Sequence, residues 1–237
     1  MQSEITIIMN AIITGATKGI GKAIAIKLAE AGYNLAVCAR TNADLITLKE
    51  ELAYTNVKVF YLATDCGDKE QVKNFCIAVT KEMPVIDVLV NNAGTFLPGS
   101  LLDEEDWNFE LQHNINVGCA YYMSKHFGKM MREVSSGSIF NICSVASKQI
   151  IENAGSYSVT KSALLSLNNV LRQELSQFNV KVTAILPGST LTASWEGTEI
   201  PAERFVQPED IADALHTILN LSSGVNVEEI IVKPLIF

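Results

Sequence analysis

The sequence has little that would bind a metal, cross a membrane or hold a nucleic acid. It contains three histidines and five cysteines, none at a metal-ligand spacing, so we expect no metal site. No apolar run reaches the ~18 residues that a membrane span requires, so we expect no membrane partner. The 18 basic residues are outnumbered by 26 acids, giving a net charge of −8. Without a basic stripe to neutralise phosphates, we expect no nucleic-acid partner.

The chain also lacks paired cysteines, an export signal and an internal linker. An odd number of cysteines without a CxxC motif is typical of free thiols in a reducing compartment, so we expect a cytoplasmic protein. The apolar residues 5–9 follow no basic region and run into a glycine turn, unlike a signal peptide. Met9 is an alternative start to Met1. With no linker to divide it, the chain of 237 residues is expected to form one domain over residues 1–237.

Strand-like and helix-like segments alternate along the chain, which is typical of a parallel sheet covered by helices on both faces. About seven strands are expected, near residues 5–13, 34–38, 57–62, 85–90, 139–143, 180–186 and 229–232. Helices are expected at residues 22–31, 43–54, 69–81, 103–132 with an interruption near 114–118, from 157 onward, and 208–221. The sequence therefore predicts an α/β fold with a Rossmann-type doubly wound parallel sheet. Residues 189–206 have little periodicity and are predicted to form a substrate lid.

We expect the chemistry around Ser144, Tyr157 and Lys161. Ser144 ends an apolar strand, and Tyr157 and Lys161 are four residues apart at the start of a helix, so they share one helical face. A free phenol has a pKa of about 10, and a nearby ammonium favours its phenolate. A serine hydroxyl can donate a hydrogen bond to the substrate oxygen that the phenol protonates. This arrangement suits the reduction of a carbonyl group.

The tyrosine–lysine spacing is weak evidence by itself. Tyr54 and Lys58 have the same spacing, but across the end of a predicted helix. Tyr121 and Lys125 have it on a predicted helix that no serine-ending strand precedes. We interpret both pairs as structural, because surface aromatics and lysines are common on helices. Tyr157 differs from both tyrosines, because it lies at the start of a predicted helix and follows a strand that ends in serine.

A glycine turn between the first strand and the first helix predicts a dinucleotide site. Its glycines allow a tight bend, and the free N–H groups of a helix N-terminus favour a pyrophosphate. The pattern is Gly-xxx-Gly-x-Gly, which differs from the common Gly-x-Gly-xx-Gly. The residues of this turn that we assign to the cofactor are Gly15, Thr17, Lys18, Gly19, Ile20 and Gly21.

The end of the second strand favours NADP(H) over NAD. It reads Ala39-Arg40, with no acid to hold a ribose 2′-hydroxyl, whereas Arg40 together with Lys18 suits a 2′-phosphate. The alternative is that both are solvated surface cations. After the third strand, Asp65 beside Cys66 is predicted either to accept a hydrogen bond from the adenine or to cap the following helix.

Small residues follow the fourth strand, in the segment Asn91-Asn92-Ala93-Gly94. Their size lets the backbone approach the cofactor ribose, and asparagine side chains can tie neighbouring strands together. We therefore assign Asn92, Ala93 and Gly94 to the cofactor site.

Five ordered motifs resemble the short-chain dehydrogenase/reductase family over nearly the whole chain. They are Thr14-Gly15-xxx-Gly19-x-Gly21, Asn91-Asn92-Ala93-Gly94, Ser144 thirteen residues before Tyr157, Tyr157-xxx-Lys161, and Pro187-Gly188. The resemblance implies that Tyr157 is the general acid, that Lys161 stabilises its phenolate and holds the nicotinamide ribose, and that Ser144 orients the carbonyl. It also implies an asparagine in the bent helix that anchors a water in a proton relay. Asn114 and Asn116 compete for this role, and the family spacing favours Asn116.

The resemblance extends to the cofactor carboxamide, the assembly and the substrate. Thr190 and Thr192, after Pro187-Gly188, are similar to positions that hold the carboxamide, and family members are most often homodimers or homotetramers. The C-terminal residues 228–237 lack the glycine pair of many 3-oxoacyl-carrier-protein reductases and look like the branch of bacterial sepiapterin reductases. We expect an NADPH-dependent reductase of a small-molecule ketone. A 3-oxoacyl-thioester reductase, an NAD-dependent alcohol dehydrogenase and a catalytically silent NADP-binding regulator remain alternatives.

Overall fold

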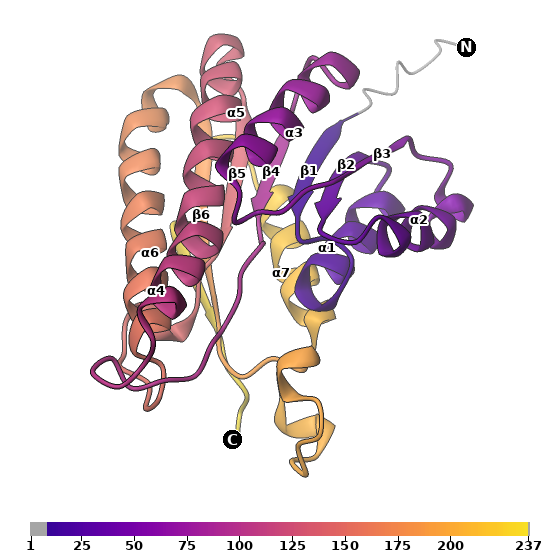
Figure 1. The fold of residues 1–237 in the computed structure, drawn as a ribbon. Helices are drawn as coiled ribbons and strands as arrows, with labels where there is room; N and C mark the ends of the chain where they lie inside the picture. Colours follow the sequence, from indigo (N-terminus) through magenta and orange to yellow (C-terminus); the bar gives the residue numbers. More distant parts are fainter. Residues whose placement is uncertain (1–8, 237) are drawn as a thin grey trace, which may run out of the picture.

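The computed structural model describes residues 9–236, which form one seven-stranded sheet flanked by helices (Figure 1). All neighbouring strands are parallel, in the order β3-β2-β1-β4-β5-β6-β7. The strands are β1 (Asn10–Thr14), β2 (Asn34–Ala39), β3 (Val59–Ala63), β4 (Val88–Asn91), β5 (Gly137–Ile142), β6 (Val180–Pro187) and β7 (Glu229–Val232). The predicted doubly wound α/β sheet is confirmed.

The helices form a layer on each face of this sheet (Figure 1). One layer holds α1 (Gly19–Glu30), α2 (Asn42–Glu51) and α7 (Pro208–Leu219), and the other holds α3 (Lys69–Glu82), α5 (Ala120–Val134) and α6 (Gly155–Leu175). The short helix α4 (Asp106–His113) packs against α6 and leads through a π-helical turn, Asn114–Cys119, into α5. Within residues 9–236, no helix is long and apolar enough to cross a bilayer.

The central strands β1 and β4 are largely apolar because both of their faces are buried. In β1, Ala11 and Ile13 pack into the core under α1, α2 and α7, while Ile12 packs into the core under α3 and α5. Successive side chains of a strand point to opposite faces. A continuous apolar run is therefore what a central parallel strand requires.

Several element boundaries differ from those predicted. The described part of the first strand begins at Asn10, and the predicted residues 5–8 lie outside the described chain. Strand β4 begins only at Val88, because Asn10 binds the residues before it: its backbone N–H donates to the Asp87 carboxylate at 2.7 Å and its side chain to the Val85 carbonyl at 2.9 Å. Helix α1 begins at Gly19 rather than at residue 22. Gly19 and Gly21 of the glycine turn therefore lie in the first turn of the helix.

The strand order places a topological switch point at the carboxyl ends of β1 and β4, where an open parallel sheet leaves a crevice. The chain leaves β1 toward β2 on one side and later returns to β4 on the other, so the helices that follow these two strands lie on opposite faces. Such a switch point is where open parallel sheets bind their ligands. The glycine turn follows β1 and the Asn92–Gly94 segment follows β4, so both predicted cofactor segments lie at this point.

Candidate active site

Tyr157 and Lys161 lie in the first two turns of α6 and on the same face of it. The Lys161 ammonium is 5.8 Å from the centre of the Tyr157 ring. Lys161 is 4% exposed, and its Nζ donates a hydrogen bond to the Ile142 carbonyl at 2.9 Å. Because Ile142 is the last residue of β5, the ammonium is fixed at the carboxyl end of the sheet. The tyrosine–lysine pair is therefore arranged as its spacing predicts.

Ser144 is buried two residues beyond β5. Its Oγ accepts the N–H of Ala146 at 3.1 Å, and its own N–H donates to the Ser147 hydroxyl at 3.3 Å. The Ser147 hydroxyl in turn donates to the Lys161 carbonyl at 2.8 Å. This network fixes Ser144 relative to α6 and leaves its O–H to donate to a substrate oxygen.

Asn116 is buried in the π-helical turn, whereas Asn114 is exposed. The side chain of Asn116 binds the backbone of Thr95 twice, with Oδ1 accepting its N–H at 2.7 Å and Nδ2 donating to its carbonyl at 3.0 Å. Nδ2 also donates to the Thr160 hydroxyl at 3.0 Å. Single π-helical turns often occur at functional sites. This one directs the Asn116 side chain toward α6.

Gly94 lies where Asn116 and Lys161 converge. A Cβ added to Gly94 would lie 3.3 Å from Asn116 Oδ1 and 3.4 Å from Lys161 Nζ. A side chain here would occupy the space between the two polar groups. The structure thus brings together Asn116, Lys161 and the segment that we assign to the cofactor ribose.

The glycine turn suits a pyrophosphate. Gly15 and Gly19 have φ of +66° and +51°, which few other residues adopt without strain. A Cβ on Gly21 would collide with the Gly15 carbonyl oxygen and the Asn92 side chain. Helix α1 has no side-chain cap and no acid in its first turn, so its free N–H groups can receive an anion. Thr17 and Ile20 are half-buried along the same turn.

Thr14 and Asn92 hold the glycine turn against the end of β4. The Thr14 hydroxyl accepts the N–H groups of Asn92 at 3.0 Å and of Ala93 at 2.9 Å. The Asn92 side chain donates to the carbonyls of Thr14 at 2.9 Å and Gly15 at 3.0 Å. This role of Thr14 was not predicted from the sequence, in which only its position directly before the first glycine points to it. Asn91 likewise joins β4 to β5 by donating to Asn141 at 2.8 Å.

Arg40 and Asp65 follow two neighbouring strands, β2 and β3, at the same edge of the sheet. The N–H of Thr64 donates to the Ala39 carbonyl at 2.9 Å, which aligns the two strand ends. Asp65 Oδ1 accepts the N–H of Gly67 at 2.8 Å. Helix α3 is capped instead by Asp68, which accepts the N–H groups of its first turn. The alternative that Asp65 caps this helix is therefore wrong.

Lys18 and Arg40 are both exposed cations, but their surroundings differ. The Lys18 ammonium lies 3.8 Å from the Asp44 carboxylate, and its side chain is 74% exposed. Within residues 9–236, Arg40 has no ion-pair partner. The sequence did not reveal Asp44 as a neighbour of Lys18, because the two positions lie in different elements.

Cys66 belongs to a chain of buried thiols beneath the Asp65 loop. Hydrogen bonds from the Cys119 and Cys38 thiols hold the pKa of Cys66 well below its ordinary value, because they stabilise its thiolate. The same contacts, together with burial, raise the pKa values of Cys38 and Cys119. Burial raises the pKa of Cys143, next to Ser144, to about 12.

The predicted lid, residues 189–206, is a loop that is closed at its base. Val206 donates its N–H to the Ser189 carbonyl at 3.0 Å, and Leu191 donates to the Val206 carbonyl at 2.9 Å. Within the loop, the rings of Trp195 and Phe205 lie 5.0 Å apart. Figure 1 shows the loop projecting beyond the carboxyl end of the sheet. Its position is that of a segment beside the crevice.

The start of this loop lies near the glycine turn. The side chain of Thr192 is next to Gly19, since a Cβ there would lie 3.0 Å from Thr192 Cγ2. Thr190 is buried and donates to the Gly188 carbonyl at 3.0 Å. Pro187 ends β6, so the residues assigned to the carboxamide follow a strand end, as the other predicted segments do.

Comparison with known proteins identifies the family. A family model described as short chain dehydrogenase matches residues 9–200. The chain belongs to the short-chain dehydrogenase family. An uncharacterised oxidoreductase of Staphylococcus aureus (strain MRSA252) is 32% identical over 227 residues, with 94% of this chain and 96% of the relative covered.

Solved structures of similar proteins agree over nearly the whole chain. An alcohol dehydrogenase from the archaeon Thermococcus sibiricus, complexed with 5-hydroxy-NADP, has a TM-score of 0.89 and 29% identity, with 97% of both chains covered. The L-sorbose reductase from Gluconobacter frateurii, complexed with NADPH and L-sorbose, has a TM-score of 0.89 and 26% identity, with 96% of this chain and 95% of that one covered. As a short-chain dehydrogenase, the protein is an oxidoreductase that acts on alcohol and ketone groups.

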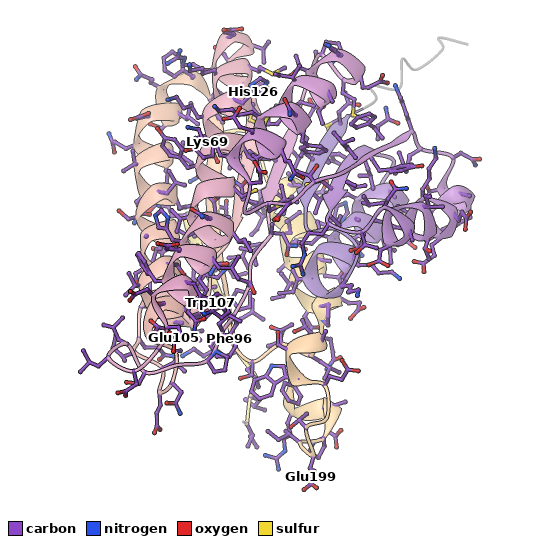
Figure 2. All side chains as sticks on the ribbon, in the orientation of Figure 1. Lys69, Phe96, Glu105, Trp107, His126 and Glu199 are labelled. Carbon is purple, nitrogen blue, oxygen red and sulfur yellow. The ribbon has the colours of Figure 1, made fainter. Side chains whose placement is uncertain are left out.

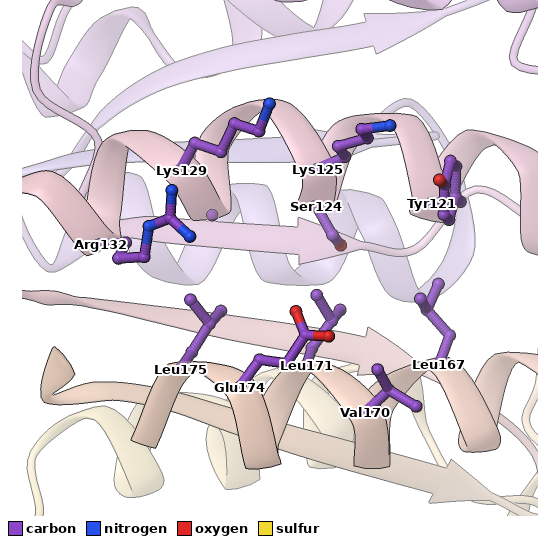
Figure 3. Close-up of a pocket in the computed structure, with 11 residues that line it drawn as sticks. Tyr121, Ser124, Lys125, Lys129, Arg132, Leu167, Val170, Leu171, Glu174 and Leu175 are labelled. Atoms are coloured by element: carbon purple, nitrogen blue, oxygen red, sulfur yellow. The ribbon is translucent and has the colours of Figure 1, made fainter. Parts of the chain in front are cut away.

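A groove on the outer surface of this short-chain dehydrogenase lies away from the residues described above. It has a volume of about 290 Å³ and lies between α5 and α6 (Figure 3). It contains the pair Tyr121 and Lys125, whose ammonium is 5.5 Å from the ring centre. None of the predicted catalytic or cofactor residues is among the residues that line it. Across residues 9–236, no group of three or more His, Cys, Asp or Glu side chains is arranged to hold a metal.

Proposed function

We propose that this short-chain dehydrogenase is an NADPH-dependent carbonyl reductase of a small-molecule ketone, with Tyr157 as the general acid. The observation that carries the proposal is the pairing of Tyr157 with the buried Lys161 ammonium at the end of β5. Ser144 is fixed beside them through Ser147. The similar structures with bound 5-hydroxy-NADP or NADPH support the choice of cofactor.

The residues around the crevice fit NADP(H). The uncapped N-terminus of α1 and its glycine turn suit the pyrophosphate, and the exposed Arg40, with Lys18, suits the 2′-phosphate. Asp65 and Cys66 would hold the adenine. Asn92, Ala93, Gly94 and Lys161 would hold the nicotinamide ribose, and Pro187, Gly188, Thr190 and Thr192 the carboxamide. The bound nicotinamide supplies the hydride that reduces the carbonyl carbon.

In this mechanism the protein holds the ketone and delivers the proton. Ser144 donates a hydrogen bond to the carbonyl oxygen, and the Tyr157 hydroxyl transfers its proton to that oxygen as the alcohol forms. Lys161 stabilises the phenolate that remains, and Asn116 holds the relay that returns a proton to it. Each turnover consumes one ketone, one NADPH and one proton and gives one alcohol and one NADP⁺. Low pH favours reduction and high pH favours alcohol oxidation.

Two further features belong to the proposal. The loop 189–206 acts as a lid over the substrate, because it lies beside the crevice and its start touches the glycine turn at Gly19. The chain assembles as a homodimer or homotetramer, which light scattering of the purified protein tests.

The test is NADPH consumption, followed at 340 nm, with a panel of pteridine diketones, 3-oxoacyl thioesters and aryl ketones. Tyr157→Phe should abolish turnover and leave NADPH binding largely unchanged. The matched control is Tyr121→Phe, which removes the hydroxyl from the other helical tyrosine–lysine pair and should keep full activity. Substantial residual activity in Tyr157→Phe would sink the assignment.

The alternatives give different results in the same experiment. A silent regulator binds NADPH but consumes it with no member of the panel. A sepiapterin-like reductase favours the pteridines, and a 3-oxoacyl-thioester reductase favours the thioesters. An NAD-dependent alcohol dehydrogenase binds NADH at least as tightly as NADPH.

A further inference from the structure

Phe96 is an aromatic side chain held against the predicted general acid. Its ring meets that of Tyr157 edge to face, with centroids 5.0 Å apart and planes inclined by 75°. The residues on both sides of it are anchored: Thr95 donates its N–H to Asn116 at 2.7 Å, and Leu97 donates its N–H to Gln112 at 3.1 Å. Phe96 nevertheless remains 42% exposed. An anchored ring therefore presents an open apolar surface beside the Tyr157 ring.

More apolar side chains are exposed on the loop that carries Phe96 and on the loop joined to it. The loop that carries Phe96 is joined to the loop before α6, because Gly99 donates its N–H to the Asn153 carbonyl at 2.9 Å and accepts the N–H of Gly155 at 3.0 Å. The two joined loops expose the large apolar residues Leu101, Leu102, Ile150 and Ile151, of which Leu102 and Ile150 are 92% and 90% exposed. Isolated exposed apolar residues are common, but a cluster of this size beside a site indicates a ligand surface.

The charge around the same end of the molecule is strongly negative. The segments 95–106, 148–155 and 189–206 contain eight acids and two bases. One of the bases, Lys148, is already paired with Glu229. Figure 2 shows Phe96, Glu105 and Trp107 at the same end of the molecule, with Glu199 at the end of the lid. This field attracts cations and opposes the approach of an anionic substrate.

We propose that Phe96 determines substrate specificity and that the site takes ketones carrying an apolar, preferably aromatic, group and no negative charge. The ring of such a substrate packs on Phe96 while its carbonyl oxygen meets Tyr157 and Ser144. Thioesters carried on a phosphorylated arm are disfavoured, because the acidic loops repel their phosphates. This inference rests on the proposed function of the Tyr157 site.

Three matched ketones separate the two parts of the proposal. Ethyl benzoylformate is neutral and aromatic, benzoylformate has the same ring with a carboxylate, and ethyl pyruvate is neutral without the ring. We expect kcat/KM for ethyl benzoylformate to exceed that for each of the others by about tenfold, from the ring contact in one case and from charge in the other. Added salt should narrow only the difference between the ester and the carboxylate, because it screens charge.

Phe96→Ala should lower kcat/KM for ethyl benzoylformate by about fivefold to tenfold, chiefly through KM, and change that for ethyl pyruvate little. The matched control is Phe109→Ala, since Phe109 is also 42% exposed but stacks on His113. Phe96→Leu keeps an apolar surface, so its kcat/KM for ethyl benzoylformate should lie between those of Phe96→Ala and the unsubstituted protein. Thermal unfolding of each variant separates a loss of ring contact from a loss of fold.

The failures of the two proposals are distinguishable. Binding of ethyl benzoylformate to the enzyme with NADP⁺, measured by ligand-observed NMR, reports on the surface even where turnover is absent. Binding that depends on Phe96 without turnover would overturn the reductase and retain the substrate class. Turnover that shows no preference for an aromatic or a neutral ketone would overturn the substrate class and retain the reductase. The same conclusion would follow if Phe96→Ala lowered kcat/KM equally for ethyl pyruvate and ethyl benzoylformate.

Discussion

The Asn116 side chain donates a hydrogen bond to the Thr160 hydroxyl at 3.0 Å, and that hydroxyl donates to the Tyr157 carbonyl at 2.9 Å. The π-helical turn is thus tied to the turn of α6 that carries the predicted general acid. The same asparagine side chain holds both polar groups of the Thr95 backbone. A change at Asn116 therefore affects the loop that follows β4 as well as α6.

Asn116→Ala should reduce both activity and stability. It leaves the Thr95 N–H and carbonyl without partners, which costs about 1–3 kcal/mol of unfolding free energy, and kcat should fall because the relay is lost. Urea unfolding and steady-state kinetics measure the two effects. Asn114→Ala is the control, because Asn114 is exposed two positions away in the same turn. Equal effects of the two substitutions would mean that the relay residue is misassigned.

Arg40→Ala should weaken NADPH binding by about tenfold or more and leave NADH binding unchanged, because a charge-assisted hydrogen bond to the 2′-phosphate is lost. Asp44→Asn should act in the opposite direction. It removes the carboxylate 3.8 Å from the Lys18 ammonium and should tighten NADPH binding by up to about fivefold. Titration of NADPH fluorescence measures both. An unchanged preference for NADPH in Arg40→Ala would contradict our interpretation of the second strand.

Cys66 should be the first thiol to react with iodoacetamide in the folded protein. Its pKa is lowered by hydrogen bonds from Cys119 and Cys38, and the thiolate is the reactive form. Alkylation of Cys66 should therefore begin at a lower pH than that of the other thiols. Cys76 and Cys143, whose pKa values burial raises to about 12, should react only after unfolding. Mass spectrometry locates the label.

Bound NADPH should protect Cys66 from this reagent, because Cys66 lies beside the predicted adenine site. Cys66→Ser supplies the control, since it should remove the fast phase and leave the others. Labelling of Cys143 as fast as that of Cys66, or labelling of Cys66 that NADPH does not slow, would count against this assignment.

Gly21→Ala should abolish measurable NADPH binding and destabilise the fold by about 1–3 kcal/mol, because the new Cβ collides with the Gly15 carbonyl and the Asn92 side chain. Gly224→Ala is the matched control, since a Cβ there meets nothing within 4 Å, and it should change stability by less than about 0.5 kcal/mol. Thermal unfolding and cofactor titration compare the two. Normal NADPH binding by Gly21→Ala would exclude the glycine turn as the pyrophosphate site.

The fold could be predicted from the sequence because its central strands are buried on both faces. Ile12 and Ile13 pack into two different cores, one on each face of the sheet. The strand is therefore a continuous apolar run, and a glycine turn marks its end. The ends of the strands also depend on polar contacts between neighbouring strands, which are harder to predict from the sequence. The contact of Asn10 with Val85 and Asp87 delays the start of β4, and no local pattern reveals it.

The candidate site could be predicted only in part. Tyr157 and Lys161 are separated by one helical turn, so their shared face follows from their spacing alone. Asp65 could not be excluded as a helix cap without knowing that Asp68 receives the first N–H groups of α3. Phe96 and Asp44 were missed because each acts on a residue in another element, and aromatic or acidic residues in loops are too common to stand out.

The loop 189–206 is joined at its base by the hydrogen bonds of Val206 with Ser189 and Leu191, which makes it an independent insertion between β6 and α7. Its ends meet at the sheet, so the chain between them can be shortened or replaced without moving β6 or α7. Residues 193–205 of this loop include none of the groups assigned to catalysis or to the cofactor, so they can vary while the reduction chemistry is kept. A loop of this length is within the range of compact surface loops whose ends lie close together, and relatives of the chain can alter it without altering the sheet.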